Sequence, residues 1–370
     1  MSSSSENFEY IASGSYGCVI MSKIDKNKII KLFENESSWK EELDNQKKIE
    51  KLDPDKKFTI KMKSNKKIIN EKFIDKIDSF HKCDLINKKT PTIYEIIYEY
   101  GGIDLFKLFN ERNDLMEKID INEFFKNFKN IIEGVKNINE KGYMHLDIKE
   151  ENILYNHEIK KFSLIDFGLS AEYNNYFKLD IELKHVFIPS EFYIISKLYN
   201  KSKIYIDDFN LYTFYEEIFK DQYNNIINKY KLNNLLNLFN NNKKINIIKK
   251  LEEINEKIKK DLSEDSLNNI ITLLKIDKTK SSNSSEFNLD KYIEKICTDN
   301  TDIRKKYDVY NIGLTLLNII LNLLLLKSNN SIYDIPLELF DLIIKMIDIN
   351  PCLRITIQEA FKEYDRIFSK

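Results

Sequence analysis

The sequence has no excess of charge of either sign. Its 370 residues include 58 lysines and arginines and 59 aspartates and glutamates, which gives a formal net charge of −1. A balanced chain creates no overall field that attracts nucleic acid or an anionic membrane surface. We therefore expect neither nucleic acid nor membrane among the partners of this protein.

Cysteine is scarce, and its four positions form no C-x-x-C pair: Cys18, Cys83, Cys297 and Cys352. Disulfide scaffolds and zinc sites usually show closer, paired spacings. His81 precedes Cys83 by two residues, but a zinc site needs two more ligands, so we expect no metal there. We predict four free thiols in a reducing compartment, and hence a cytoplasmic location.

Long apolar runs are also missing. The longest, 312–326, is shorter than the roughly 20 residues that a membrane-spanning helix needs, and Thr315, Asn318 and Asn322 interrupt it. The first residues, Met1 followed by serines, show no basic segment before an apolar one, so they do not predict a signal peptide. We expect a soluble globular chain in which the run forms a buried helix, because 42% of the residues are hydrophobic.

Chemically useful side chains gather in the stretch Y-M-H-L-D-I-K-E-E-N-I-L at 143–154 and in I-D-F-G just downstream. Asp147 and Asp166 supply carboxylates, Asn152 supplies an amide oxygen and Lys149 supplies a cation. Magnesium prefers such oxygen ligands, combined with the oxygens of a phosphate group. The set indicates phosphoryl transfer, which depends mostly on positioning and charge neutralisation.

A lone D-F-G or a lone H-x-D occurs by chance in many turns, but the shared order and spacing argue against chance here. H-x-D-x-K-x-x-N followed by D-F-G resembles the catalytic segments of eukaryotic-type protein kinases. The lysine of D-x-K resembles serine/threonine kinases rather than tyrosine kinases. The composition, rich in asparagine, lysine and isoleucine, also resembles kinases of large, mimivirus-like DNA viruses.

The resemblance implies a role for each polar residue. Asp147 would orient the substrate hydroxyl and accept its proton, while Lys149 would steady the γ-phosphate of ATP. Asn152 and Asp166 would hold Mg²⁺. We interpret His145 as a packed, hydrogen-bonded scaffold residue rather than a general base.

Two earlier segments resemble the parts of a kinase that bind ATP. Residues 8–20 read as strand, glycine turn and strand, and they match G-x-G-x-x-G-x-V except that Ala12 replaces the first glycine. Lys31, on a predicted strand at 28–33, matches the lysine that pairs with the α- and β-phosphates. The nucleotide-binding residues implied here are Ile11, Gly14, Gly17, Val19 and Lys31.

A helix is predicted over 37–52, with Ser37 or Ser38 as its N-cap. It resembles the kinase C-helix, whose glutamate pairs with the strand lysine. We favour Glu42 over Glu41 for this pairing, and the alternative for either is a solvated charged face.

Residues 55–91 are polar and basic, and they predict only short strand-like pieces. The strand that follows ends in a Gly-Gly pair and resembles the last N-lobe strand and the hinge. By this alignment Tyr98 is the gatekeeper, and backbone groups of Glu99 and Gly101 face adenine. Asp104 would either reach the ribose or cap the helix that follows.

Three further matches lie far downstream. Residues 189–191 resemble A-P-E, 307–313 resemble D-V-W-S-x-G and 350–356 resemble D-P-x-x-R-x-T. The family implies an ion pair between Arg354 and Glu191. These matches disfavour small-molecule kinases of related fold.

The fold implied by the resemblance is a two-lobed α+β kinase, with a small antiparallel sheet and one helix over a mostly helical lobe. We predict a kinase domain over 7–366, with an N-lobe at 7–99 and a C-lobe at 103–366. A helical insert is expected at about 195–303, since the family needs far fewer residues there. Its apolar stripes, such as Ile247, Leu251, Ile254 and Ile258, either pack on the C-lobe or dock a partner.

The resemblance implies ATP- and Mg²⁺-dependent phosphorylation of serine and threonine in protein substrates. Leu146 stands where the family has an arginine that pairs with a phosphorylated activation segment, so we expect activity without that phosphorylation. The alternative is a pseudokinase that binds nucleotide and docks a partner. Ala12, the bulky Ile29 and the polar Asn45 and Gln46 one turn after the helix glutamates favour that alternative, whereas the intact catalytic residues oppose it.

Overall fold

The computed structural model describes most of the chain outside the insert. The described residues are 7–14, 17–69, 73–78, 80–83, 86, 91–173, 189, 242–261, 303–325, 335–348 and 350–369. The chain divides into two compact units, which we describe one at a time. The first comprises residues 1–103 and 154–168, and the second comprises residues 104–153 and 169–370.

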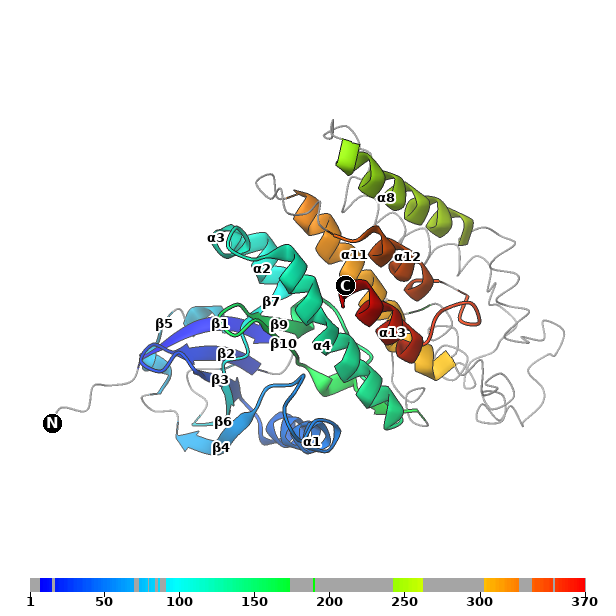
Figure 1. Ribbon diagram of the computed structural model, residues 1–370. Helices are drawn as coiled ribbons and strands as arrows, with labels where there is room; N and C mark the ends of the chain where they lie inside the picture. Colours follow the sequence, from blue (N-terminus) through cyan, green and yellow to red (C-terminus); the bar gives the residue numbers. More distant parts are fainter. Residues whose placement is uncertain are drawn as a thin grey trace, which may run out of the picture. The chain divides into compact units, whose positions relative to one another are not determined.

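The first unit is built on a six-stranded sheet with the strand order β4-β6-β3-β2-β1-β5 (Figure 1). The strands are β1 (Phe8–Gly14), β2 (Gly17–Ser22), β3 (Lys28–Phe33), β4 (Met62–Ile69), β5 (Ile77–Asp78) and β6 (Thr92–Glu99). All neighbours are antiparallel except β1 and β5, which run parallel. The predicted antiparallel sheet is therefore correct for five strands, and the complete sheet is mixed.

Strand β4 lies where the sequence predicted only short strand-like pieces. Its side chains are mostly exposed and include three lysines, so the strand lacks the apolar alternation that would have revealed it. It forms an edge of the sheet, where exposed lysines also discourage pairing with another chain.

Both faces of the sheet are covered. Ile30 and Leu32 of β3 belong to an apolar cluster on one face, whereas Ile29 and Phe33 belong to a cluster on the other. Alternation along a strand sends successive side chains to opposite faces, so Lys31 shares its face with the second pair. Helix α1 (Glu36–Leu52) lies on that face, and its Trp39 packs into the second cluster.

The N-cap of α1 is Asn35, whose side-chain oxygen accepts from the Ser38 amide at 2.9 Å. The prediction of Ser37 or Ser38 as the cap was wrong by two or three positions. Asparagine caps helices as well as serine does, and its position lets the helix begin at Glu36.

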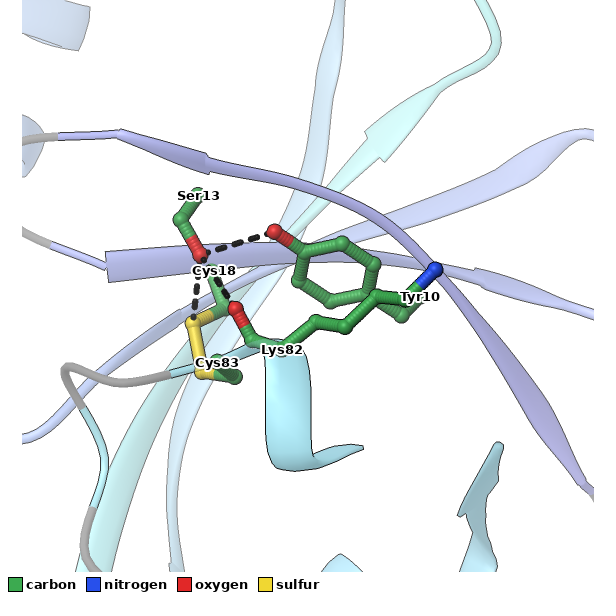
Figure 2. Close-up of a disulfide and its surroundings, with 5 residues drawn as sticks. All are labelled: Tyr10, Ser13, Cys18, Lys82 and Cys83. Atoms are coloured by element: carbon green, nitrogen blue, oxygen red, sulfur yellow. Dashed lines mark hydrogen bonds between the residues drawn. A yellow bond between two sulfur atoms is a disulfide. The ribbon is translucent and has the colours of Figure 1, made fainter. Parts of the chain in front are cut away.

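The opposite face of the sheet is covered by a segment with two 3₁₀ turns, η1 (Ile74–Lys76) and η2 (Phe80–Lys82). A disulfide joins Cys83, just after η2, to Cys18 on β2 (Figure 2). Their Cα atoms are 5.9 Å apart, within the range that disulfides require. The prediction of free thiols was wrong for this pair, because a separation of 65 residues leaves no local spacing signal.

Figure 2 shows the Ser13 hydroxyl beside this disulfide, at the end of β1. It donates to the Lys82 carbonyl at 3.3 Å and lies 2.9 Å from the Tyr10 hydroxyl. The glycine hairpin is thus attached to the covering segment both covalently and by a hydrogen bond. Of the other cysteines, Cys352 is a free thiol and Cys297 lies outside the described residues.

Strands β9 (Ile153–Asn156) and β10 (Lys161–Leu164) are neighbours and form a hairpin, and β7 (Ile103–Asp104) is a short strand near the unit boundary. The second unit is mainly helical. Its helices are α2 (Leu105–Glu111), α3 (Asn113–Met116), α4 (Ile121–Glu140), α8 (Asn242–Asp261), α11 (Tyr307–Leu325), α12 (Leu337–Met346) and α13 (Ile357–Phe368). The short strands β8 (Tyr143–Met144) and β11 (Ala171–Glu172) pair antiparallel.

The core of the second unit forms around α4, which packs on α13, and α11, which packs on α12. The apolar residues of α4 recur at helix spacing and are fully buried: Phe124, Phe125, Phe128, Ile131, Ile132, Val135 and Ile138. The apolar run lies in α11 as far as residue 325, and its described apolar side chains are buried, as expected. Among the described helices, none has the length and apolarity needed to cross a membrane.

Helix α8 belongs to the predicted insert and packs on α12. Its stripe residues Ile247, Leu251 and Ile254 are buried, and Lys250 pairs with Asp341 of α12 at 2.8 Å. This part of the insert therefore packs on the helical unit, one of the two alternatives that the sequence left open. A second apolar stripe at 267–274 lies outside the described residues.

Candidate active site

In the second unit, Lys149 and Asn152 both bind Asp147. The Lys149 ammonium lies 2.9 and 2.8 Å from the two carboxylate oxygens of Asp147. The Asn152 amide nitrogen donates to the backbone oxygen and to Oδ2 of Asp147, both at 2.8 Å. The amide nitrogen of Asn152 already donates these two hydrogen bonds, so the amide oxygen of Asn152 is the atom that would bind a cation.

The backbone of this loop is held in an unusual conformation. Leu146 has φ of 69°, in the left-handed region that costs a bulky residue about 1–3 kcal/mol. Asp308, at the start of α11, accepts from the amides of His145 at 2.8 Å and Leu146 at 3.0 Å. These two bonds fix the turn that places Asp147 next in the chain.

Asp308 is fully buried, and this burial raises the pKa of its carboxyl, against the opposing effects of His145 and the two backbone donors. His145 is buried too, and its Nδ1 accepts from the Asp147 amide at 3.3 Å. This geometry matches the interpretation of His145 as a hydrogen-bonded scaffold residue.

In the first unit, the Lys31 ammonium donates to Oε2 of Glu42 on α1 at 2.8 Å. Both side chains are about one quarter exposed (23% and 25%), so solvent still reaches the pair. Lys31 lies opposite Val19 of β2 and Ile96 of β6. The pairing partner is Glu42, the glutamate favoured from the sequence.

The glycine hairpin of β1 and β2 contains a bulge at Ile11, since Tyr10 and Ala12 pair with consecutive residues of β2. A Cβ atom on Gly17 would lie 2.0 Å from the Leu32 carbonyl oxygen of β3. Gly17 is therefore required by packing against β3, a reason that the sequence pattern did not reveal. Gly14 pairs with Gly17 across the hairpin, whose tip at 15–16 lies outside the described residues.

Both glycines of the Gly-Gly pair after β6 lie against closely packed neighbours, side chains for Gly101 and backbone for Gly102. A Cβ on Gly101 would lie 2.5 Å from Ile60 and 2.7 Å from Leu154. Gly102 has φ of 112°, and its Cβ would lie 2.3 Å from the Tyr155 backbone. Any side chain at either position would displace the β9 hairpin or strain the chain.

The two polar residues flanking this pair have defined partners. The Glu99 amide donates to the Lys61 carbonyl at 3.0 Å, and the Lys61 amide donates to the Glu99 side chain at 3.1 Å. Asp104 accepts from the Lys107 amide at 2.8 Å and caps α2. Of the two roles considered for Asp104, the structure shows the cap.

Asp166 follows β10 with φ of 60°, and its exposed carboxylate accepts from the Gly168 amide at 3.4 Å. No cluster of three or more histidine, cysteine or acidic side chains that could hold a metal occurs in the described ranges. Asp166 offers a carboxylate in the first unit, and Asn152 offers an amide oxygen in the second. Mg²⁺ typically combines one or two protein ligands with phosphate oxygens rather than using an all-protein cage.

The predicted partner of Arg354, Glu191, lies outside the described residues, as does Ser190. Arg354 itself is buried, and its guanidinium donates to the backbone oxygens of Asp348 at 2.7 Å and Lys306 at 3.1 Å. These bonds give Arg354 a structural role in joining the starts of α11 and α13.

One contact at the site was not anticipated from the sequence. The Tyr98 hydroxyl donates to Oε1 of Glu42 at 3.0 Å, whereas the sequence indicated only that Tyr98 is the gatekeeper. The sequence offered one signal for this bond: a tyrosine at the gatekeeper position, together with a predicted helix that carries a glutamate.

Comparison with known proteins agrees with this geometry. The protein kinase domain model matches residues 6–364. The chain is 35% identical over 94 residues to serine/threonine-protein kinase pim-2 of Danio rerio, covering 25% of this chain and 29% of that protein. It is 30% identical over 125 residues to human myosin light chain kinase family member 4, covering 32% and 31%.

A third relative is the human cell division cycle 7-related protein kinase, 35% identical over 57 residues, which are 15% of this chain and 10% of that protein. The alignments thus cover less than a third of each relative's length. The family match, by contrast, extends over almost the whole chain. It includes both the Asp147 loop of the second unit and the Lys31–Glu42 pair of the first unit. This chain belongs to the protein kinase family.

Proposed function

We propose that this protein phosphorylates serine and threonine residues of other proteins, using ATP and Mg²⁺. The observation that carries the proposal is the Asp147 carboxylate, which Lys149 and Asn152 hold at 2.8–2.9 Å. A carboxylate fixed in this way can accept a proton from a substrate hydroxyl as the hydroxyl attacks phosphorus.

The remaining residues would bind the nucleotide. Lys31, oriented by Glu42, would contact the α- and β-phosphates, and the hinge at Glu99 and Gly101 would contact adenine. Mg²⁺, when bound, neutralises charge on the phosphate oxygens. Asn152 and Asp166 would hold it, and Lys149 would stabilise the γ-phosphate beside Asp147.

Preference for serine and threonine is supported by Lys149 and by the similarity to pim-2 of Danio rerio, a serine/threonine-protein kinase. A docking partner for the insert would use residues other than the α8 stripe, since that stripe is buried on α12. A cytoplasmic location and an origin in a large DNA virus are proposals that localisation and genomic context would test.

Incubation with radiolabelled ATP, Mg²⁺ and generic protein substrates tests the function directly. We expect label on phosphoserine and phosphothreonine, and none when Mg²⁺ is chelated. Label confined to phosphotyrosine, or to small-molecule acceptors, would contradict the proposal.

The competing function is a pseudokinase that binds nucleotide without transfer. Gln46, one turn after Glu42, is buried with an exposed fraction of 3%, and its amide nitrogen has no hydrogen-bond partner among the described residues. A buried polar group without a partner weakens the packing of α1, and this observation favours the pseudokinase. Nucleotide-dependent thermal stabilisation without any phosphate transfer would identify this function.

A further inference from the structure

Two tyrosines of β6 bond to helix α1. Tyr94 and Tyr98 are four residues apart on the strand, so both point to the face that α1 covers. The Tyr98 hydroxyl donates to Glu42 at 3.0 Å, and the Tyr94 hydroxyl donates to Glu36 at 3.4 Å. The same chemical contact therefore occurs twice, once at the glutamate that binds Lys31 and once outside the site.

Tyr98 is a rigid donor. It is 7% exposed, and its strand is paired on both sides, with Ile29 of β3 and Met62 of β4 opposite it. Burial, followed by the nearby Glu42 carboxylate, raises the pKa of the Tyr98 hydroxyl well above its usual value. The hydroxyl therefore keeps its proton and donates throughout the working pH range.

The Glu42 carboxylate uses a different oxygen for each partner: Oε1 for Tyr98 and Oε2 for Lys31. Lys31 has a long flexible stem and cannot by itself fix the rotation of the carboxylate. Tyr98 has only two side-chain torsions and is anchored on a strand that is paired on both sides, so its bond sets the direction in which Oε2 points.

Helix α1 has few other means of holding Glu42 in place. The apolar residues that it contributes to the cluster on this face, Trp39 and Leu43, are only partly buried. Its buried residues one turn beyond Glu42 are the polar Asn45 and Gln46. Hydrogen bonds from the sheet must therefore contribute a large share of the interactions that hold α1 on the sheet near Glu42.

We propose that Tyr98 is a positioning residue of the phosphoryl-transfer site, whose hydroxyl holds Glu42 so that Lys31 is oriented towards the nucleotide phosphates. The inference rests on the proposed function for the role of Lys31. It differs from a role in closing the adenine pocket, because phenylalanine would supply the same bulk without the hydrogen bond.

The test compares Tyr98→Phe with Tyr94→Phe, which makes the same change on the same strand face. For Tyr98→Phe we expect kcat/KM for ATP to fall about tenfold, the size typical of losing a hydrogen bond to a charged group. The KM for ATP should rise while the KM for the peptide stays constant. Tyr94→Phe should change neither constant by more than about twofold, because Glu36 is 52% exposed.

A variant that is merely less well folded would lower the apparent kcat and leave both KM values unchanged. That result for Tyr98→Phe, or equal effects of the two substitutions, would overturn the proposal. Trp39 adds a spectroscopic check, since it is the only tryptophan and its ring lies 5.1 Å from that of Tyr94. Its emission should shift in Tyr98→Phe if α1 moves, and an unchanged spectrum would count against the proposal.

A double-mutant cycle separates this proposal from the proposed function. Tyr98→Phe and Glu42→Ala, alone and combined, are compared by urea unfolding, which needs no activity. We expect their effects to be non-additive by several-fold in the folding equilibrium constant, and those of Tyr94→Phe and Glu36→Ala to be additive. Additive effects at Tyr98 and Glu42 would overturn the positioning role, whereas an inactive wild type with a coupled pair would overturn only the proposed function.

Discussion

A few individual charged residues set the geometry of the catalytic loop. Asp308 accepts two backbone amides, and Lys149 and Asn152 hold the Asp147 carboxylate. Together, these contacts hold Leu146 in its unfavourable left-handed backbone conformation. Loss of one acceptor should therefore affect folding and activity together.

Asp308→Asn tests this dependence. The amide nitrogen of asparagine would face one of the two backbone donors and leave it buried without an acceptor. We expect the free energy of unfolding to fall by about 1–3 kcal/mol, measured by urea denaturation. Asp341→Asn, which removes an exposed ion pair with Lys250, should change it by less than about 1 kcal/mol, and equal effects would contradict the account.

The sequence indicates candidate residues for the site, but it does not indicate most of their contacts. Lys31, Asp147 and Asn152 are recognisable because their spacing is local. The Tyr98–Glu42 bond joins residues 56 apart, and the need for a glycine at Gly17 arises from the carbonyl of a neighbouring strand. Such contacts depend on sheet register, which no local pattern contains.

At the level of elements, α4, α11 and the strands with apolar alternation were predictable because their residues repeat at helix or strand spacing. The edge strand β4 was not, since lysines occupy its exposed side chains. The covering segment and its disulfide were missed because Cys18 and Cys83 are far apart in the chain. We expect the disulfide between them to stabilise the folded protein.

Removing the Cys18–Cys83 disulfide should destabilise the sheet. A closed loop of 65 residues lowers the entropy of the unfolded chain, and the expected contribution is about 2–4 kcal/mol. Urea unfolding of Cys18→Ser, or of wild type with a dithiol reductant, should show this loss. Cys352→Ser is the matched control with a free thiol, and an identical midpoint for all variants would contradict the prediction.

Helix α8 should stabilise the helical unit although it lies in an insert. Leu251 is 4% exposed, so Leu251→Ala should lower the free energy of unfolding by about 2–5 kcal/mol. The neighbouring Glu252 is exposed, and Glu252→Ala should have almost no effect. If both variants unfold like wild type in urea, the stripe does not contribute to the core.

In the whole molecule, the residues that depart from the family pattern, such as Leu146, affect the expected regulation more than the expected catalytic reaction. Leu146 cannot pair with a phosphate on the activation segment. Three hydroxyl residues follow the D-F-G motif closely in the sequence: Ser170, Tyr173 and Tyr176. Ser170 is buried, and the Tyr173 hydroxyl donates to the Asn139 carbonyl at 2.9 Å. The third, Tyr176, lies outside the described residues. We infer that the active arrangement forms without phosphorylation.

Phosphatase treatment should therefore leave most of the activity intact. Mass spectrometry would verify that Ser170, Tyr173 and Tyr176 carry no phosphate, and turnover would be compared before and after treatment. A loss of more than about tenfold, restored by rephosphorylation, would show that the segment is regulated in the usual way.

The central claim is that Asp147 is the residue that accepts the substrate proton. The most direct measurement compares phosphate transfer and ATP affinity in wild type and in Asp147→Asn. In Asp147→Asn we expect transfer to fall by about a hundredfold to ten-thousandfold while the dissociation constant for ATP stays nearly unchanged. Transfer at the wild-type rate in Asp147→Asn would contradict the claim.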